Sequence, residues 1–315
     1  MYFPAAGIEV NPFIPPLVAF CISFFTSMGG VSGAFLLLPF QVSALGFTAP
    51  SVSATNQLFN IVAIPSGVYR YIKEGRMVWP LTWVVIVGTL PGVLAGALLR
   101  IRYLPDPRQF KMFAALVLLY IGLRLLKDLL TRKMEERGQR VNADHALRQL
   151  AEGKEGQDNA GLPMVTLQRA GLFRIRYSFQ GNDYEAGTCA IFALSLGVGV
   201  VGGIYGIGGG AIIAPFFVSV FGLPVHTVAG ASLMATFVTS VAGVLFYQLM
   251  APLYPKLAVA PDWLLGLLFG GGGFCGMYFG ARLQKFVPAK AIKWMLAGTV
   301  LATAAKYVLD FFAGG

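Results

Sequence analysis

Two long stretches without charged side chains limit this sequence to a membrane-spanning fold more than any other feature does. Between Val10 and Tyr69 no residue carries a charge, and between Ala186 and Pro255 only His226 can acquire one. A membrane-spanning helix needs about 20 predominantly apolar residues, so each stretch is long enough for several. Charged residues make up 12% of the chain, about half their share in an ordinary soluble protein. We therefore expect an all-α polytopic membrane protein.

The uncharged stretches and the polar joints between them predict eight helical segments. They cover residues 12–45, 50–70, 77–100, 109–130, 187–222, 226–250, 262–284 and 288–312. A polar stretch opens with a charged helical pattern and continues with two alternating runs around Gly171, which predict a β-hairpin. The chain is thus expected to contain a first membrane repeat at 1–130, a soluble linker at 131–185 and a second membrane repeat at 186–315. For the linker, a connecting role is favoured over a regulatory one.

The two membrane halves repeat one pattern of glycines and aromatic residues, which indicates gene duplication. A shift of 176 residues relates the first parts of the halves, and a shift of 184 relates the later parts. The first shift places Gly30 on Gly206, Gly33 on Gly209, Pro39 on Pro215, Asn56 on Ser232, Asn60 on Thr236 and Tyr71 on Tyr247. The second places Gly88 on Gly272, Gly92 on Gly276 and Gly96 on Gly280.

The first segment of each half has an unusual length. Residues 12–45 would form a helix about 50 Å long, too long for one crossing of a hydrocarbon core of about 30 Å and too short for two. Glycine clusters interrupt these segments at 29–33 and 203–210. We predict two inverted repeats of four helical segments, the first of each broken or re-entrant at mid-membrane. A single tilted helix with close-packing glycines is the alternative.

The distribution of Lys and Arg favours the re-entrant interpretation. If each half contains a hairpin, most of the basic residues lie on one side of the membrane. If the long segments cross only once, the basic residues are divided more evenly between the two sides. Because basic residues prefer the cytoplasmic side, the linker is expected in the cytoplasm and both termini outside.

The helix breaks predict a binding site for a small anion. A half-helix that starts at a break directs unpaired backbone N–H groups and its positive dipole end toward that point, and the central parts of the apolar segments contain no Lys or Arg. Polar side chains follow each break, although interhelical hydrogen bonding is their alternative role. The predicted substrate-binding residues are Gly30, Ser32, Gly33, Ser53, Asn56, Gln57, Asn60, Gly206, Gly208, Gly209, Gly210, Ser232 and Thr236.

Other kinds of chemistry find little support in the sequence. The net charge of +10 follows from basic residues at the ends of membrane segments, so no nucleic acid is expected. We expect no cofactor, no metal and no enzyme activity, because no nucleotide-binding loop, metal-ligand spacing or catalytic triad is visible. For His226, a capping or interfacial role is favoured over proton relay. Cys21, Cys189 and Cys275 are expected to be inert thiols, with a sulfur relay as the alternative.

Two sequence patterns resemble one family of membrane transporters. They are GGVSGAFLLLPF followed by SVSATNQLFN in the first half, and GIYGIGGGAIIAPFF followed by HTVAGASLMATFVTS in the second. Both are similar to the sulfite exporter TauE/SafE family, and the resemblance covers nearly all of 12–312 except the linker. It implies a secondary transporter, in the direction of export, for sulfite, thiosulfate or an organosulfonate in the inner (cytoplasmic) membrane.

Alternatives to a transporter are an anion channel or facilitator, and a membrane sulfur-relay protein that uses its cysteines. The expected partners are the small anionic substrate and the lipid bilayer, and a homodimer is left open.

Overall fold

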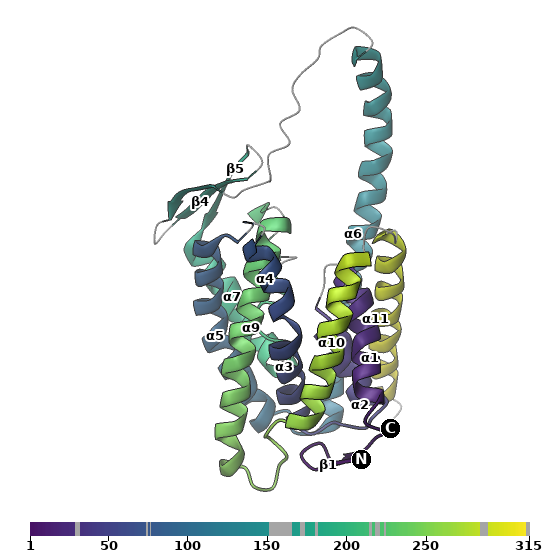
Figure 1. Ribbon diagram of the computed structural model, residues 1–315, viewed down its shortest axis with the longest axis vertical. Coiled ribbons are helices and arrows are strands. Elements are labelled where there is room, and N and C mark those ends of the chain that lie inside the picture. The colour runs from purple at the N-terminus through teal and green to yellow at the C-terminus, as the bar shows by residue number, and fades with distance from the viewer. Residues whose placement is uncertain are drawn as a thin grey trace.

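The computed structural model describes residues 1–28, 32–73, 75, 77–150, 166–170, 174–179, 182–213, 216–217, 221–223, 225–283 and 289–312. The chain is mostly helical, and the helices pack into one bundle from which the end of α6 projects (Figure 1). The helices are α1 (Ile14–Met28), α2 (Ala34–Ser43), α3 (Ser51–Ala63), α4 (Pro65–Lys73), α5 (Trp79–Arg102), α6 (Pro107–Leu150), α7 (Thr188–Tyr205), α9 (Val225–Met250), α10 (Trp263–Leu283) and α11 (Ala289–Phe312).

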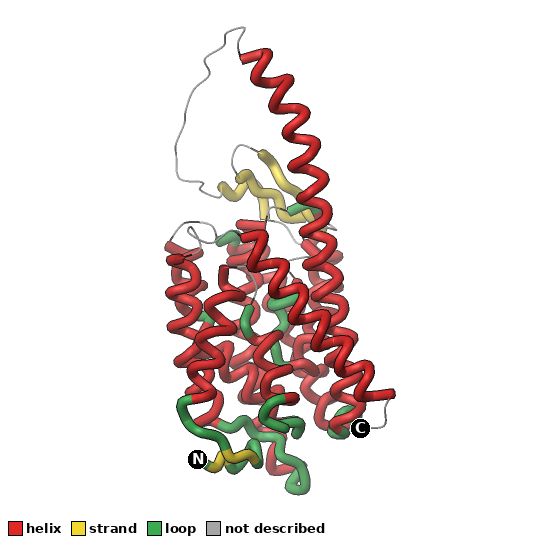
Figure 2. The backbone as a smooth tube through the Cα atoms, turned by 90° about the vertical axis from the view of Figure 1, so that its right-hand side faces the viewer, coloured by secondary structure: helices red, strands yellow, loops and turns green. Residues whose placement is uncertain are grey.

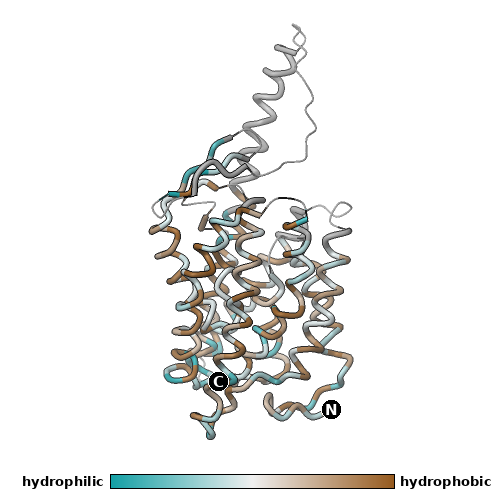
Figure 3. Tube along the Cα trace, turned by 60° about the vertical axis from the view of Figure 1, so that its left-hand side comes forward, coloured by the Kyte–Doolittle hydropathy of each residue, from teal (hydrophilic) through white to brown (hydrophobic). Residues whose placement is uncertain are grey.

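Six helices in the described part of the chain are long and apolar enough to cross a membrane. They span Trp79–Arg102, Pro107–Lys127, Thr188–Tyr205, Val228–Leu253, Trp263–Gly280 and Trp294–Phe312. Apolar residues predominate along the bundle (Figure 3), and large apolar side chains such as Leu17, Trp83 and Leu249 are exposed on its outside. Lipid suits such a surface better than water does. These helices confirm the predicted helical character of the segments.

The first long segment, 12–45, is interrupted and turns back on itself. α1 ends at Met28 and α2 starts at Ala34. The hydroxyl of Ser51, beyond α2, donates to the carbonyl of Ala5, before α1, at 3.1 Å. The segment therefore begins and ends at the same end of the bundle, where both termini lie (Figures 1 and 2).

The second long segment is interrupted at its glycine cluster. α7 ends at Tyr205, and Gly206 takes a left-handed conformation with φ of +83°, from which its N–H donates to Gly202 O at 2.9 Å. Gly208 has φ of +79°. Side chains disfavour this region of φ, so glycine is required for the sharp exit from the helix. Of the predicted residues, Gly30 in the first break lies outside the described residues.

Glycines spaced by four bring helices of opposite halves into backbone contact. α5 of the first half packs on α7 of the second, and α10 of the second packs on α1 of the first. A Cβ added to any of these glycines would overlap or crowd a backbone carbonyl of the partner helix. The pairs are Gly88 with Phe192, Gly92 with Leu196, Gly96 with Val200, Gly272 with Pro16, Gly276 with Phe20 and Gly280 with Phe24. The shifts of 184 and 176 residues relate each of the three contacts between α5 and α7 to one of the three contacts between α10 and α1.

Helices α3 and α9, which the repeat relates to each other, run antiparallel in the middle of the bundle. Gln57 contacts Gly243, Asn60 contacts Ser240, and Gly67, at the start of α4, faces Leu233. Partner numbers thus fall along α9 as they rise along α3. Because α3 starts at the end of the bundle with the termini, α9 starts at the opposite end.

The polar stretch between the halves contains more regular structure than the sequence predicts. α6 runs without a break from the bundle to Leu150. The predicted hairpin is present as β3 (Thr166–Ala170) and β4 (Arg174–Phe179), which pair antiparallel. A third strand, β5 (Asn182–Gly187), was not predicted and pairs with β4, where Arg174 and Glu185 form an ion pair at 2.8 Å. A second unpredicted hairpin, β1 (Tyr2–Phe3) with β2 (Ile8–Glu9), lies at the N-terminus.

Candidate functional site

Helix α3 is the polar centre of the bundle. Each residue from Ser51 to Asn60 is buried, and α3 packs against α2, α9 and α10. Four of the predicted site residues lie on it and are completely shielded, namely Ser53, Asn56, Gln57 and Asn60. Polar groups in such a place need hydrogen-bond partners, so the partners that they find indicate what each side chain does.

Asn56 and Asn60 connect the two helix breaks. The Asn56 amide donates to Ala34 O in α2 at 3.0 Å and to Gly206 O at 3.1 Å. The Asn60 amide donates to Ile207 O at 3.0 Å. Carbonyls at the end of a helix lack partners within that helix, and these two asparagines supply partners to the end of α7. The breaks, distant in sequence, are thereby held in one place.

Further hydrogen bonds surround the first break. The Ser32 hydroxyl donates to Asn60 Oδ1 at 3.5 Å and accepts the N–H of Ala34 at 3.4 Å. A Cβ added to Gly33 would lie 3.0 Å from the Ser23 hydroxyl oxygen of α1. Ser53, by contrast, donates to Ile204 O in the last turn of α7, at the second break, at 2.9 Å. Ser32, Gly33 and Asn60 therefore lie together at the first break, and their role in binding stays a prediction.

The glycines of the second break pack closely against α9 and α5. A Cβ added to Gly208 would lie 2.9 Å from Ser240 Oγ, and one on Gly210 would lie 2.7 Å from Thr236 Oγ1. The N–H of Gly209 donates to Thr239 Oγ1 at 3.0 Å. An anion could use this N–H only after Thr239 has released it. Thr236 itself donates to Ser232 O within α9 at 2.8 Å.

Gln57 differs from the two asparagines beside it. Neither its Nε2 nor its Oε1 has a hydrogen-bond partner within the described part of the chain, although the side chain is completely buried against Gly243. The same holds for Ser232 Oγ and Gln41 Oε1. An unsatisfied buried polar group costs about 1–3 kcal/mol. Gln57 is therefore the central side chain with the most unused hydrogen-bonding capacity.

Several residues of the centre were missed by the sequence analysis. Gln41 Nε2 donates to Asn56 Oδ1 at 3.3 Å, and Thr89 fills the space next to Gly209. The Tyr205 hydroxyl donates to Phe35 O at 2.9 Å. Pro39 in α2 has no N–H to donate to Phe35 O. This carbonyl is therefore free to accept the Tyr205 hydroxyl. The polar residues in apolar segments and the internal proline were the available signals.

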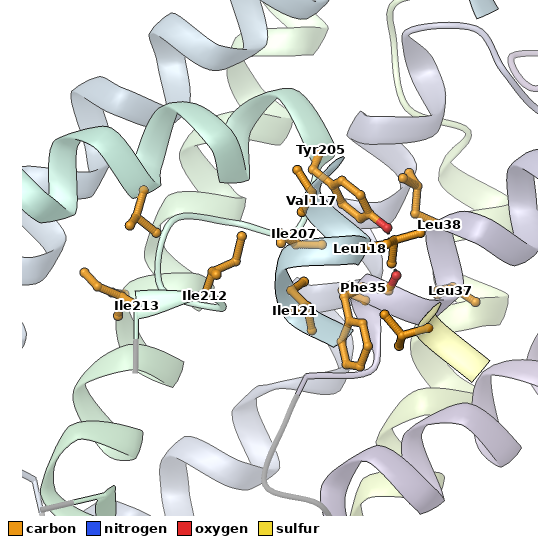
Figure 4. Close-up of a cluster of buried hydrophobic side chains, with 14 of the residues drawn as sticks. Phe35, Leu37, Leu38, Val117, Leu118, Ile121, Tyr205, Ile207, Ile212 and Ile213 are labelled. Atoms are coloured by element: carbon orange, nitrogen blue, oxygen red, sulfur yellow. Dashed lines mark hydrogen bonds between the residues drawn. The ribbon is translucent and has the colours of Figure 1, made fainter. Parts of the chain in front are cut away.

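An apolar cluster fixes both breaks against α6. Phe35 and Leu38 from α2, Leu118 from α6, and Tyr205 and Ile207 from the second break converge there (Figure 4). All five are buried. The polar centre is thus backed by closely packed apolar side chains.

Charged side chains and thiols of the described residues lie away from the centre. Among the described residues, the buried charged side chains are Arg100 and Asp262, in the last turn of α5 and just before α10. Cys21, Cys189 and Cys275 are exposed on the outside of the bundle. In the same described residues no group of His, Cys, Asp and Glu is arranged to hold a metal ion. The side chain of His226 falls outside the described part.

A cavity of about 410 Å³ lies between exposed residues of α5 and α7. Its lining is apolar and consists of Trp83, Val84, Val87, Thr188, Cys189 and Phe192. It includes none of the predicted site residues.

Comparison with known proteins places this geometry in a family. The sequence profile described as "Sulfite exporter TauE/SafE" matches residues 16–307. The chain belongs to this family. It is 22% identical over 275 residues to the "Probable membrane transporter protein YunE" of Bacillus subtilis (strain 168), covering 84% of this chain and 86% of that one. It is also 28% identical over 115 residues to the "Probable membrane transporter protein YdhB" of the same organism, covering 36% of this chain and 44% of that one.

No solved structure matches the chain. As a TauE/SafE member with six helices able to span a membrane, the protein is a multi-pass membrane transporter. The resemblance seen in the sequence is thereby confirmed.

Proposed function

We propose that this TauE/SafE protein is a secondary transporter that exports a small sulfur-containing anion, such as sulfite, thiosulfate or an organosulfonate, across the cytoplasmic membrane. The observation that carries the proposal is the junction of two helix breaks at a buried polar centre in which no described residue is cationic. Such a centre can bind an anion through amides, hydroxyls and the positive N-terminal end of α2. The family's description supplies the sulfur chemistry.

The proposed architecture is a pair of inverted repeats with a re-entrant segment at the start of each. The antiparallel course of α3 and α9 supports the inversion, because the repeat relates these two helices. The equivalent glycine contacts of α5 on α7 and of α10 on α1 support the repeat itself. Transporters of this type alternate access by moving one bundle against another around a fixed site.

For the orientation, we keep the assignment that the positive-inside rule favours. The linker lies in the cytoplasm and both termini lie outside. The projecting end of α6 and β3–β5 lie at one end of the bundle and both termini at the other (Figures 1 and 2), which is compatible with it. A homodimer remains a prediction.

In the proposed site, Gln57 contacts the anion, and Asn56 and Asn60 position the breaks. Gln57 offers two N–H donors that no described residue uses, whereas the asparagine amides are occupied by Ala34, Gly206 and Ile207. Backbone N–H groups at Ser32, Gly33 and Gly208–Gly210 contribute when the breaks open. The lack of a glutamine at the equivalent position in the second half, Leu233, makes the two half-sites unequal.

An anion channel or facilitator is the second candidate function. It is favoured by the absence of a charged side chain from the described residues of the centre, since coupling to an ion gradient often uses such a group. A sulfur relay has less support, because the three cysteines face outward.

The test is reconstitution into liposomes with radiolabelled sulfite, thiosulfate, sulfate and a sulfonate, with and without imposed proton and sodium gradients. Uptake of one of the sulfur anions against its concentration gradient supports secondary transport. Equilibration without accumulation under every gradient would support the facilitator. A protein that moves none of the four anions would overturn the proposed function.

A further inference from the structure

A polar seam leads from the centre to the end of the bundle that carries the termini. On α3, Ser53, Gln57 and Asn60 share one face, because residues three and four apart lie above one another on a helix. Their partners on α9 are Tyr247, Gly243 and Ser240, in that order. The Tyr247 hydroxyl lies near Ser53 and donates to Gly203 O at 3.4 Å.

The seam ends at Arg100, a buried cation whose helix neighbours Ala97 and Ile101 pack with Tyr247 and whose charge acts on the Tyr247 hydroxyl. Its guanidinium donates to Thr48 O at 2.8 Å and to Leu104 O, and it lies over the Phe110 ring, 3.7 Å from the ring centroid. Its Nε has no partner in the described part of the chain. Among the described residues, no acidic side chain forms a salt bridge with it. Two carbonyl oxygens and the Phe110 ring compensate the buried Arg100 charge only in part, because none of them carries a full negative charge.

We infer that Arg100 is a second anion-binding position, at the end of the seam nearer the termini. This inference rests on the proposed function, since it assumes that the protein transports an anion. An anion that leaves Gln57 along the seam passes Ser53 and Tyr247 and meets this fixed positive charge before it reaches water. Arg100 would accept an oxyanion, because its planar fork of N–H donors matches two oxygens of sulfite, sulfate or a sulfonate.

Arg100 could instead be a clamp that only holds the carbonyls of Thr48 and Leu104 together. The two roles differ in what loss of the charge changes. A clamp affects the stability of the fold, whereas a binding position affects the anion concentration at which transport is half-saturated.

The experiment compares Arg100→Gln with Arg102→Gln, a matched control that removes the same charge two residues away on an exposed side chain. Initial rates of radiolabelled sulfite transport are measured in proteoliposomes, with sulfite supplied on the face that carries the termini. We expect KM to rise at least about tenfold in Arg100→Gln, the effect of losing one charged hydrogen bond. In Arg102→Gln it should stay within about twofold of wild type. An unchanged KM in folded Arg100→Gln, with a lower melting temperature, would overturn the inference in favour of the clamp.

A second measurement uses the wild-type protein, in case Arg100→Gln does not fold. The protein is treated with the arginine reagent phenylglyoxal, with and without methanesulfonate, a sulfonate that, unlike sulfite, does not add to the aldehyde of the reagent, and adducts at Arg100 and Arg102 are quantified by peptide mass spectrometry. Methanesulfonate should slow modification of Arg100 at least threefold and leave Arg102 unaffected. Equal rates of Arg100 modification with and without the anion would contradict the assignment. The absence of any adduct at Arg100, in protein that transports, would contradict it too. Wild-type protein that transports no anion at all would instead overturn the proposed function on which the inference rests.

Discussion

Replacement of Gln57 by methionine should separate stability from transport. Methionine has nearly the same length and shape as glutamine, so the contact with Gly243 is kept while both polar atoms are removed. Because Nε2 and Oε1 have no partner in the described part of the chain, their removal relieves an unsatisfied burial worth about 1–3 kcal/mol. The folded protein should therefore be as stable as wild type or more stable.

Transport should change in the opposite direction. If the Gln57 amide donates to the anion, its loss weakens binding by about 1.5–3 kcal/mol, which is roughly a ten- to hundredfold loss of affinity. The matched comparison is Asn60→Leu, which leaves Ile207 O without its donor and should lower stability by about 1–2 kcal/mol.

Two measurements are needed for both variants. Thermal unfolding in detergent reports stability, and the concentration dependence of sulfite uptake into proteoliposomes reports binding. Gln57→Met with wild-type uptake kinetics would show that the side chain is a packing group. A loss of stability in Gln57→Met as large as in Asn60→Leu would refute the assignment of different roles to the two amides.

Four further predictions follow from the described contacts. Gly276→Ala should lower stability by about 1–3 kcal/mol because its Cβ would overlap Phe20 O, whereas Gly271→Ala on the same helix, with open space around its Cβ, should not; thermal unfolding in detergent distinguishes them. Gly209→Ala should lower stability because its Cβ would overlap that of Thr89, and it should weaken anion binding by more than this loss of stability explains; Thr89→Gly, which copies the equivalent Gly273, should then restore stability more than affinity. Affinity that merely follows melting temperature across the series would exclude a backbone anion site. Replacing Cys21, Cys189 and Cys275 together by serine should leave anion uptake unchanged, because all three are exposed outside the centre; lost uptake in a folded variant would revive the sulfur relay. In that cysteine-free protein, Lys154→Cys should react with an impermeant maleimide from the cytoplasmic side and Tyr2→Cys and Gly314→Cys from outside, and a cytoplasmic Tyr2→Cys would contradict the re-entrant segments.

The sequence was informative about the features that repetition encodes. Glycine clusters inside segments of unusual length marked both helix breaks. The shifts of 176 and 184 residues predicted which glycines are equivalent in the two halves. Polar side chains in α3 stood out because a lipid-exposed helix could not tolerate Asn56, Gln57 and Asn60 together.

Other features depend on which segments meet in space. Asn56 and Gln57 are neighbours of similar chemistry, and only the positions of α2 and of the end of α7 give one of them carbonyl partners and leave the other without any in the described residues. Arg100 had the sequence position of an ordinary helix-end cation, but Phe110 and the backbone at Thr48 cover it. Strand β5 was missed because its residues, NDYEAG, lack the β-branched side chains that predict strands.

The exchange of partners between the halves has a consequence for biogenesis. When a ribosome has completed the first half, the glycine faces of α1 and α5 have been made, but α10 and α7, which cover them, have not. Those backbone surfaces therefore remain without their partner helices in the membrane until the second half is inserted. The first half can therefore be integrated into the bilayer before it is folded, and final assembly is delayed until synthesis has passed α10.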